Sequence, residues 1–292
     1  FILIPAGHIW KFVTLAYIPP TIAGVVLAYR KKYLLGGVIT ALFIALQIQS
    51  NHIQMSYYFM FVILFFIIAY FVDAYEKKEL PHFFKASAIL ALAAVVGVCV
   101  NISNLYHTYE YSKETMRGKS ELKQEGPAAN QTSSGLDRDY ITNWSYGIGE
   151  TLTLLVPNVK GGGCSTTLSQ NETAMAKANP MYGNLYSQLT PYFGDQPWTA
   201  GPVYVGAFVV FLFILGCFIV KGPLKWALLG ATIFSILLSW GKNFMGLTDF
   251  FIDYIPMYNK FRAVSSILVI AEFTIPLLAI FALKEILSKP DI

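Results

Sequence analysis

The sequence predicts an all-α polytopic membrane protein with about seven transmembrane helices. Of its 292 residues, 55% are hydrophobic and only 13% are charged, whereas soluble domains carry about a quarter charged residues. The apolar residues gather in runs close to the roughly 20 residues that cross a bilayer as a helix. These runs lack the period-two alternation of a transmembrane β-barrel, and helices satisfy their own backbone polar groups in lipid. The predicted spans cover residues 12–29, 34–50, 55–72, 86–105, 203–220, 224–240 and 264–283.

The spans divide the chain into three parts. Residues 1–105 hold four spans, residues 106–200 form one long polar region, and residues 201–292 hold three more spans. In the first span, Pro19 and Pro20 predict a kink. The chain begins at Phe1 without a signal-peptide pattern, and its first apolar residues resemble the end of an earlier element. We therefore expect a piece of a longer membrane protein.

Lysine and arginine in the short connections predict the orientation, because cytoplasmic loops carry an excess of them. One side collects ten basic residues: Arg30, Lys31, Lys32, Lys77, Lys78, Lys85, Lys221, Lys225, Lys284 and Lys289. The opposite short connections hold four, namely Lys11, Lys242, Lys260 and Arg262. The richer side is predicted to be cytoplasmic, so the 106–200 region is extracytoplasmic. The formal net charge of +4 then reflects the membrane topology. The sequence has no basic patch interleaved with aromatic residues, the pattern that would indicate nucleic-acid binding.

The 106–200 region contains ten tyrosine and tryptophan residues, which is too aromatic for a disordered linker. Residues 106–122 are predicted to extend the fourth span outward as a helix until Gly118 weakens it. Residues 140–156 carry apolar side chains at helical spacing and predict a helix on the membrane surface. A run of three glycines at 161–163 predicts a turn. Beyond this region, residues 249–255 predict a second interfacial helix that ends at Pro256.

Several separated strings resemble the bacterial YfhO family of large integral membrane proteins, over essentially the whole chain. The strings are Gly-His-Ile-Trp-Lys (7–11), Asn-His-Ile-Gln-Met-Ser-Tyr-Tyr (51–58), Thr-Tyr-Glu-Tyr-Ser-Lys (108–113), Arg-Gly-Lys-Ser-Glu-Leu (117–122), Trp-Ser-Tyr-Gly-Ile-Gly-Glu-Thr (144–151), Tyr-Phe-Gly-Asp-Gln-Pro (192–197) and Asn-Lys-Phe-Arg (259–262). The resemblance implies a GT-C-like glycosyltransferase of the cytoplasmic (inner) membrane. Such enzymes take a sugar from a polyprenyl-phosphate carrier and transfer it to a cell-envelope acceptor on the extracytoplasmic face. The usual GT-C carboxylate of the first outer loop has no match here: either it lies upstream of Phe1, or this chain does the chemistry in another way, or it does none.

This chemistry needs a cationic clamp for the lipid phosphate. Lys260 and Arg262 are the first candidates, because they lie where the last span enters the bilayer on the outer side. Two further outer clusters are His8 with Lys11 and His52 with Gln54. Each of these residues could instead make only a structural or lipid-headgroup contact.

The chemistry also needs a carboxylate that deprotonates the acceptor hydroxyl. Asp195 and Glu150 are the candidate catalytic carboxylates, because both lie among aromatic residues of the outer region. The alternatives are a turn-capping role for Asp195 and a solvent-facing position for Glu150. Asp249 and Asp253 share one face of the predicted outer helix and could hold a divalent cation, although two carboxylates are few for a metal site. No other residues have metal-ligand spacing.

Glu272 lies within the last span, where a charge costs about 2.5–3.5 kcal/mol on insertion scales. It must therefore be neutral, paired or facing a water-filled cavity, with Gln47, Asn101 and Asn104 as candidate partners. A proton relay and an inter-helix hydrogen bond are both compatible with this position. A transporter or lipid-handling protein, with Glu272 and the kinked first span along its pathway, is therefore the main alternative function. A non-catalytic scaffold with an aromatic docking loop is the third.

Overall fold

Each of the seven apolar runs contains a helix in the computed structural model, which describes residues 9–118 and 135–288. No strand occurs in these residues, so the all-α prediction is confirmed. Four helices are long and apolar enough to cross a membrane: Ile9–Tyr29, Ile53–Glu76, Leu80–Cys99 and Val264–Ser288. A fifth candidate is the pair Pro223–Ser239 and Gly241–Tyr254, which bends by 107° at its junction. By length and composition, the described residues therefore contain four or five membrane spans.

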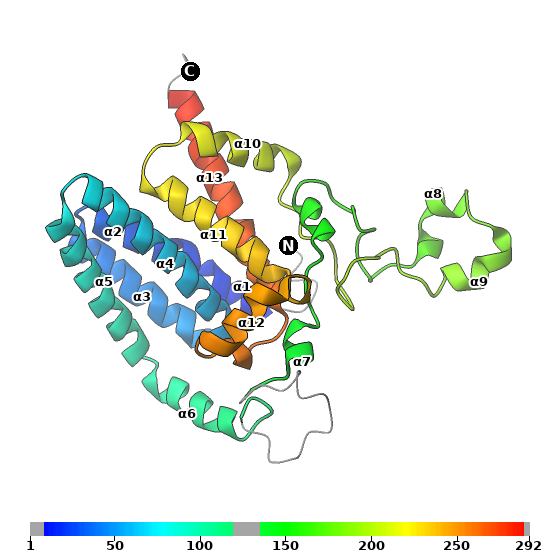
Figure 1. Cartoon of the computed structure of the whole chain (residues 1–292), viewed down its shortest axis with the longest axis horizontal. Helices are drawn as coiled ribbons and strands as arrows, with labels where there is room; N and C mark the ends of the chain where they lie inside the picture. The colour runs from blue at the N-terminus through cyan, green and yellow to red at the C-terminus, as the bar shows by residue number, and fades with distance from the viewer. Residues whose placement is uncertain (1–8, 119–134, 289–292) are drawn as a thin grey trace.

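The bundle has an N-terminal and a C-terminal group of helices (Figure 1). The first group contains α1 (Ile9–Ala16), α2 (Ile18–Tyr29), α3 (Tyr33–Gln49), α4 (Ile53–Glu76) and α5 (Leu80–Cys99). The second contains α10 (Ala207–Ile219), α11 (Pro223–Ser239), α12 (Met245–Tyr254) and α13 (Val269–Ser288). Within the groups, α3 packs between α2 and α5, and α13 packs against α10 and α11. The two groups meet chiefly where α4 packs against α11.

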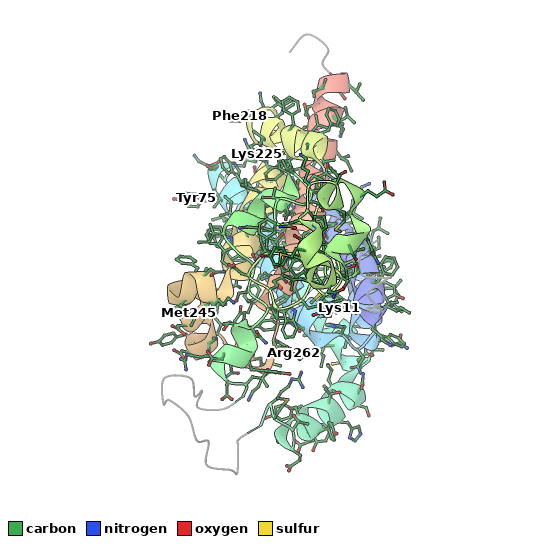
Figure 2. The ribbon with its side chains drawn as sticks, turned by 90° about the vertical axis from the view of Figure 1, so that its right-hand side faces the viewer. Lys11, Tyr75, Phe218, Lys225, Met245 and Arg262 are labelled. Atoms are coloured by element: carbon green, nitrogen blue, oxygen red, sulfur yellow. The ribbon has the colours of Figure 1, made fainter. Side chains whose placement is uncertain are left out.

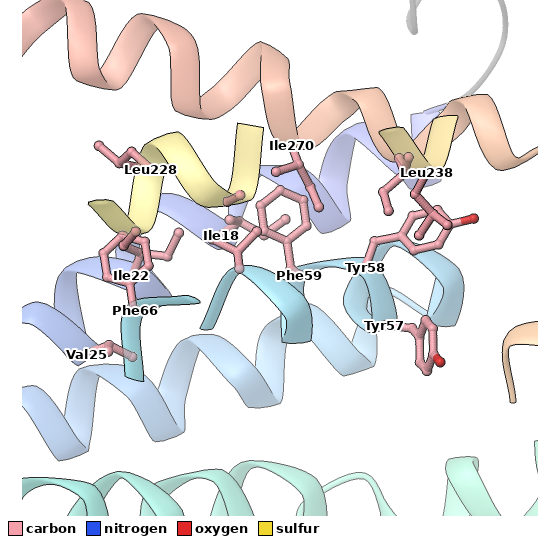
Figure 3. Close-up of a cluster of buried hydrophobic side chains, with 14 of the residues drawn as sticks. Ile18, Ile22, Val25, Tyr57, Tyr58, Phe59, Phe66, Leu228, Leu238 and Ile270 are labelled. Carbon is pink, nitrogen blue, oxygen red and sulfur yellow. The ribbon is translucent and has the colours of Figure 1, made fainter. Parts of the chain in front are cut away.

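The interface between the two groups is the hydrophobic core of the protein (Figure 3). Tyr58 and Phe66 of α4 are at most 1% exposed, and Leu228 of α11 and Ile270 of α13 are fully buried. Helices in lipid associate through van der Waals packing rather than through the hydrophobic effect. The large side chains of α4 therefore fix how the two groups sit against each other.

The helices α2 and α3 approach closely through glycine. A Cβ on Gly36 would lie 2.5 Å from the backbone nitrogen of Ala28 and 2.7 Å from the carbonyl oxygen of Gly24. A Cβ on Gly24 would meet Thr40 of α3 in the same way. Small residues at such contacts are what bring transmembrane helices together.

We expect Gly36→Ala to destabilise the protein by about 1–3 kcal/mol, because the added methyl group must push the two backbones apart. The measurement is the thermal unfolding midpoint of the purified protein in lipid nanodiscs. Gly246→Ala is the matched control, since nothing lies within 4 Å of a Cβ at that position. Equal midpoints for the two variants would contradict the close approach.

The first predicted span is broken where its prolines stand. Helix α1 ends at Ala16 and α2 begins at Ile18, with Pro19 and Pro20 in its first turn. The carbonyl oxygen of Tyr17 accepts hydrogen bonds from both the backbone N–H and the hydroxyl of Thr21, at 3.2 and 2.7 Å. Because Pro19 and Pro20 have no N–H to donate to the carbonyl groups of Leu15 and Ala16, the helix is interrupted at Tyr17, in the span where the kink was predicted.

The outer region differs from the prediction in two places. The fourth span ends at Cys99, and a separate helix α6 (Ile102–Lys113) follows, with no buried residue. The surface helix predicted at 140–156 was wrong as one element, because this stretch holds α7 (Arg138–Thr142), a turn and a 3-10 helix at Gly149–Leu154. The backbone N–H of Tyr146 donates to Ser239 and that of Gly147 donates to the Glu150 side chain. These contacts replace the continuous i to i−4 ladder that a helix needs.

After the 3-10 helix at Gly149–Leu154, the chain forms a projecting arm. It contains α8 (Glu172–Met175) and α9 (Gly183–Tyr186), which Figure 1 shows standing away from the bundle. No residue of either short helix is buried. The turn predicted at the three glycines lies just before them, at residues 157–160, and is closed by the Gly161 N–H, which donates to the Asn158 carbonyl at 2.8 Å. Gly161 and Gly162 follow it at φ +84° and +102°.

Candidate functional site

A cavity of about 1040 Å³ lies at one end of the bundle, and we call it the large cavity. Its wall combines the start of α1, the α3–α4 connection, α6 and the segment before α13, together with outer-region residues near Trp144 and Trp198. Half of the described lining residues have apolar or aromatic side chains, among them Leu15, Met55 and Phe261. Its volume is at the upper end of the range for small-molecule sites, about 300–1000 Å³.

Cations dominate the charges on this wall. Among the described residues that line it, Lys11, Arg117, Lys260 and Arg262 are cationic, and Glu272 is the single carboxylate. Lys11 and Arg262 are near enough for their charges to repel, and both lie in the lower half of Figure 2. None of these four cations forms an ion pair with a carboxylate among the described residues, and like charges gathered in this way favour an anionic ligand.

Arg262 is held by aromatic side chains. Its Nη1 donates to the Tyr140 hydroxyl at 2.7 Å, and its guanidinium lies 5.4 and 5.9 Å from the ring centroids of Tyr140 and Trp144. Its backbone carbonyl accepts a hydrogen bond of 2.6 Å from the Gln54 side chain. A guanidinium carries five N–H donors, so most of its donors are left for a ligand.

Lys260 and Arg117 fix each other. The Lys260 Nζ donates to the Arg117 carbonyl at 2.6 Å, and the Arg117 Nε donates to the Lys260 carbonyl at 2.9 Å. Burial lowers the pKa of Lys260 from its usual value. This exchange joins the end of α6 to the segment before α13, and Arg117 was missed as a site residue. The available signal was a lone arginine at the end of an aromatic, polar helix.

The predicted phosphate-binding residues converge on this cavity. Lys260, Arg262, Lys11, His52 and Gln54 all line it, although they come from three separate parts of the chain. Gln54 also donates to the Tyr58 hydroxyl at 2.9 Å. His8 lies outside the described residues.

Glu272 faces the large cavity. Its side chain is exposed and lines the wall, and no described residue forms a hydrogen bond or ion pair with its carboxylate. The candidate partners are placed elsewhere: Gln47 is buried in α3, and the Asn101 side chain donates to the Ala45 carbonyl at 2.9 Å. Of the three states expected for this residue, the structure therefore matches the cavity-facing one.

Glu150 does not reach the large cavity and is not solvent-facing. It is 2% exposed. Its Oε2 accepts from the backbone N–H groups of Gly147 and Asp195 at 2.7 and 3.2 Å, and its Oε1 accepts from the Tyr192 hydroxyl at 2.6 Å. Burial and the hydrogen bond to Glu150 raise the pKa of Tyr192 above its usual value, so this hydroxyl stays a donor. Glu150 joins two distant parts of the outer region.

Asp195 is exposed but lies beside the large cavity rather than in its wall. Its Oδ2 accepts a hydrogen bond of 2.9 Å from the Asn243 side chain, and its carbonyl accepts one of 3.1 Å from the Lys242 Nζ. The next residue, Gln196, does line the cavity. The turn at 194–197 thus presents Gln196, not Asp195, to the cavity.

Asp249 and Asp253 share one face of α12, as predicted, and both bind Arg138. The two ion pairs measure 3.0 and 2.6 Å. Across residues 9–118 and 135–288, no group of three or more histidine, cysteine, aspartate or glutamate side chains is placed to hold a metal ion. The two aspartates therefore fasten α12 to α7.

No protein-family model, no curated protein and no solved structure matches this chain.

Proposed function

We propose that this chain is a membrane glycosyltransferase that binds a polyprenyl-phosphate-linked sugar in the large cavity. The sugar would pass to a cell-envelope acceptor on the extracytoplasmic face. The observation that carries this proposal is the composition of the cavity wall, where the described residues supply apolar and aromatic surface, four cations and one carboxylate. A lipid-linked phosphate combines an apolar chain with an anion, and this wall suits both.

The proposal assigns the parts as follows. Arg262, Lys11 and Lys260 bind the phosphate, and Arg262 supplies a planar fork that matches two phosphate oxygens. The oxygen of the acceptor hydroxyl attacks C1 of the sugar, and Glu272 takes the proton of that hydroxyl. The bond between C1 and the phosphate oxygen breaks, and polyprenyl phosphate leaves with the electron pair. The cations stabilise the charge that develops on that oxygen.

The proposal includes seven crossings of the bacterial inner membrane. Helices α3 and α10 have 17 and 13 residues, about 25 and 20 Å of helix, against a hydrocarbon core of about 30 Å. In support, α3 packs between two long helices and α10 packs along α13. The large cavity then opens on the outer side, because the basic connections gather at the other end of the bundle.

We expect Arg262→Gln to weaken binding of polyprenyl phosphate by about tenfold or more, because a charge-assisted bidentate contact is lost. Binding is measured on protein in nanodiscs by the rise of the unfolding midpoint with ligand concentration. Polyprenol of the same chain length lacks the phosphate and should bind both proteins alike. Lys177→Gln, which removes an exposed charge on the projecting arm, is the matched control. Unchanged affinity for polyprenyl phosphate in Arg262→Gln would remove this residue from the site.

A lipid-handling or transport protein is the second candidate, favoured by an exposed carboxylate inside a candidate span. In that case the cavity would carry its ligand across the membrane without breaking a bond. Incubation with radiolabelled polyprenyl-phosphate sugar separates the two functions. Release of free polyprenyl phosphate supports transfer, whereas movement of the intact labelled lipid between leaflets supports transport.

A further inference from the structure

A second cavity, of about 430 Å³, lies where three connections of the bundle meet. They are the α2–α3 turn at 30–32, the α4–α5 turn at 77–79 and the α10–α11 turn at 220–222. Each turn contains one residue in the left-handed region, namely Lys31, Lys78 and Gly222. Tyr75 and Lys225, beside two of these turns, lie in the upper half of Figure 2, away from Lys11 and Arg262. This cavity is therefore distinct from the large cavity.

An aromatic stack forms one wall of the second cavity. The Tyr29 ring is stacked between Tyr70 and Phe83, with centroid distances of 4.5 and 5.5 Å. Beside it, the two ring nitrogens of His82 contact the Tyr33 hydroxyl at 2.6 Å and the Tyr29 carbonyl at 2.8 Å. Because both Tyr29 faces and both His82 nitrogens are used within the protein, this wall is rigid rather than a stacking platform for a planar ligand.

The charges of the second cavity leave a positive surplus. Two ion pairs stand at its edge, Lys31 with Glu79 at 3.0 Å and Lys77 with Asp73 at 2.8 Å. Arg30 and Lys221 line the same cavity, and no carboxylate among the described residues forms an ion pair with either. Arg30 lies beside the Tyr70 side chain, which lines the same cavity. With these two pairs formed, a net charge of about +2 faces the cavity.

We propose that the second cavity binds a phosphate group between Arg30 and Lys221. A phosphomonoester carries a charge of about −1.5 to −2 at neutral pH, which matches this surplus. The Arg30 fork and the Lys221 ammonium come from different connections, so a phosphate between them would link the two helix groups. Pro223 and Leu224 give the cavity an apolar side for the remainder of the ligand. The phosphate is either the headgroup of an anionic lipid or a soluble phosphate.

The experiment uses the whole chain in nanodiscs of zwitterionic lipid. One arm adds phosphatidic acid to the disc, with diacylglycerol as the phosphate-free control, and the other adds inorganic phosphate to the buffer. The unfolding midpoint is followed for the wild type, Arg30→Gln/Lys221→Gln and the control Lys32→Gln/Lys284→Gln. The control removes two exposed lysines of the same predicted side that do not line the cavity.

We expect phosphatidic acid to raise the midpoint of the wild type and the control alike. The apparent affinity should fall about tenfold or more in Arg30→Gln/Lys221→Gln. A response to phosphatidic acid alone identifies a lipid headgroup, and a response to both ligands identifies a site open to soluble phosphate. No response to either ligand, or equal losses in the two double variants, would overturn the proposal.

Two additions separate this site from other effects. The first is the variant Arg262→Gln. If the ligand no longer raises the unfolding midpoint in this variant, the ligand binds in the large cavity, and the proposal is overturned. Should the double variant fail to fold, Lys221→Gln alone takes its place, because Lys221 is exposed and makes no ion pair among the described residues. Since the two cavities are separate, failure here leaves the proposed sugar transfer untouched.

Discussion

Replacing Glu272 by glutamine is expected to lower the kcat of sugar transfer by a factor of about 10² to 10⁴, the usual contribution of a general base. Glutamine keeps the volume and a hydrogen-bonding oxygen, but it cannot take the proton of the acceptor hydroxyl. The substitution also removes the only carboxylate among the described residues that line the large cavity. Binding of polyprenyl phosphate should be unchanged or slightly tighter, because a negative charge facing the four cations is lost.

The measurement is release of polyprenyl phosphate from a labelled polyprenyl-phosphate sugar, with kcat and KM determined separately. Glu172→Gln on the projecting arm is the matched control, and Asp195→Asn tests the carboxylate favoured by the sequence. Full activity in Glu272→Gln together with loss in Asp195→Asn would return the base to Asp195. A fall in leaflet-to-leaflet transport, with no transfer activity in any variant, would instead favour the second candidate function.

Replacing Glu150 by alanine is expected to destabilise the outer region by about 3 kcal/mol or more, because a buried carboxylate that accepts three hydrogen bonds is lost. Three donors lose their acceptor at once: two backbone N–H groups, of Gly147 and Asp195, and the Tyr192 hydroxyl. A buried donor left without an acceptor costs about 1–3 kcal/mol. Tyr192→Phe removes one of these contacts and should have the smaller effect.

Protease cleavage within residues 144–201, followed on protein in nanodiscs, reports this loss because local opening exposes the chain. Glu172→Ala is the control for removing an exposed carboxylate from the same region. The bundle helices should keep their far-ultraviolet circular dichroism in all variants. An unchanged cleavage rate in Glu150→Ala would show that the three contacts do not hold the region together.

Helices were predictable from the sequence because twenty apolar residues in lipid have few other ways to satisfy their backbone. The sequence also placed Lys11, Gln54 and Arg262 on one side of the membrane, because each lies at the outer end of a predicted span. Their common cavity depends on how the spans pack. Hydropathy does not contain that information.

The role of Glu150 was not predictable in the same way. Apolar residues at helical spacing around it predicted a surface helix, in which a glutamate faces solvent. Its burial depends on contacts with Tyr192 and Asp195, more than 40 residues away in the sequence. Spacing within one segment could not predict a contact of that separation. The position of Glu272 toward a cavity was one of three states that its sequence context allowed, and the choice required the packed bundle.

The projecting arm also has a practical consequence. Short peptide tags are best tolerated at exposed chain that makes few contacts, and the stretch around residues 175–184 meets this condition. An epitope inserted there would stand clear of both cavities. Antibody access to it in sealed vesicles would establish on which side of the bilayer the large cavity opens, in the same preparation that is used to measure ligand binding.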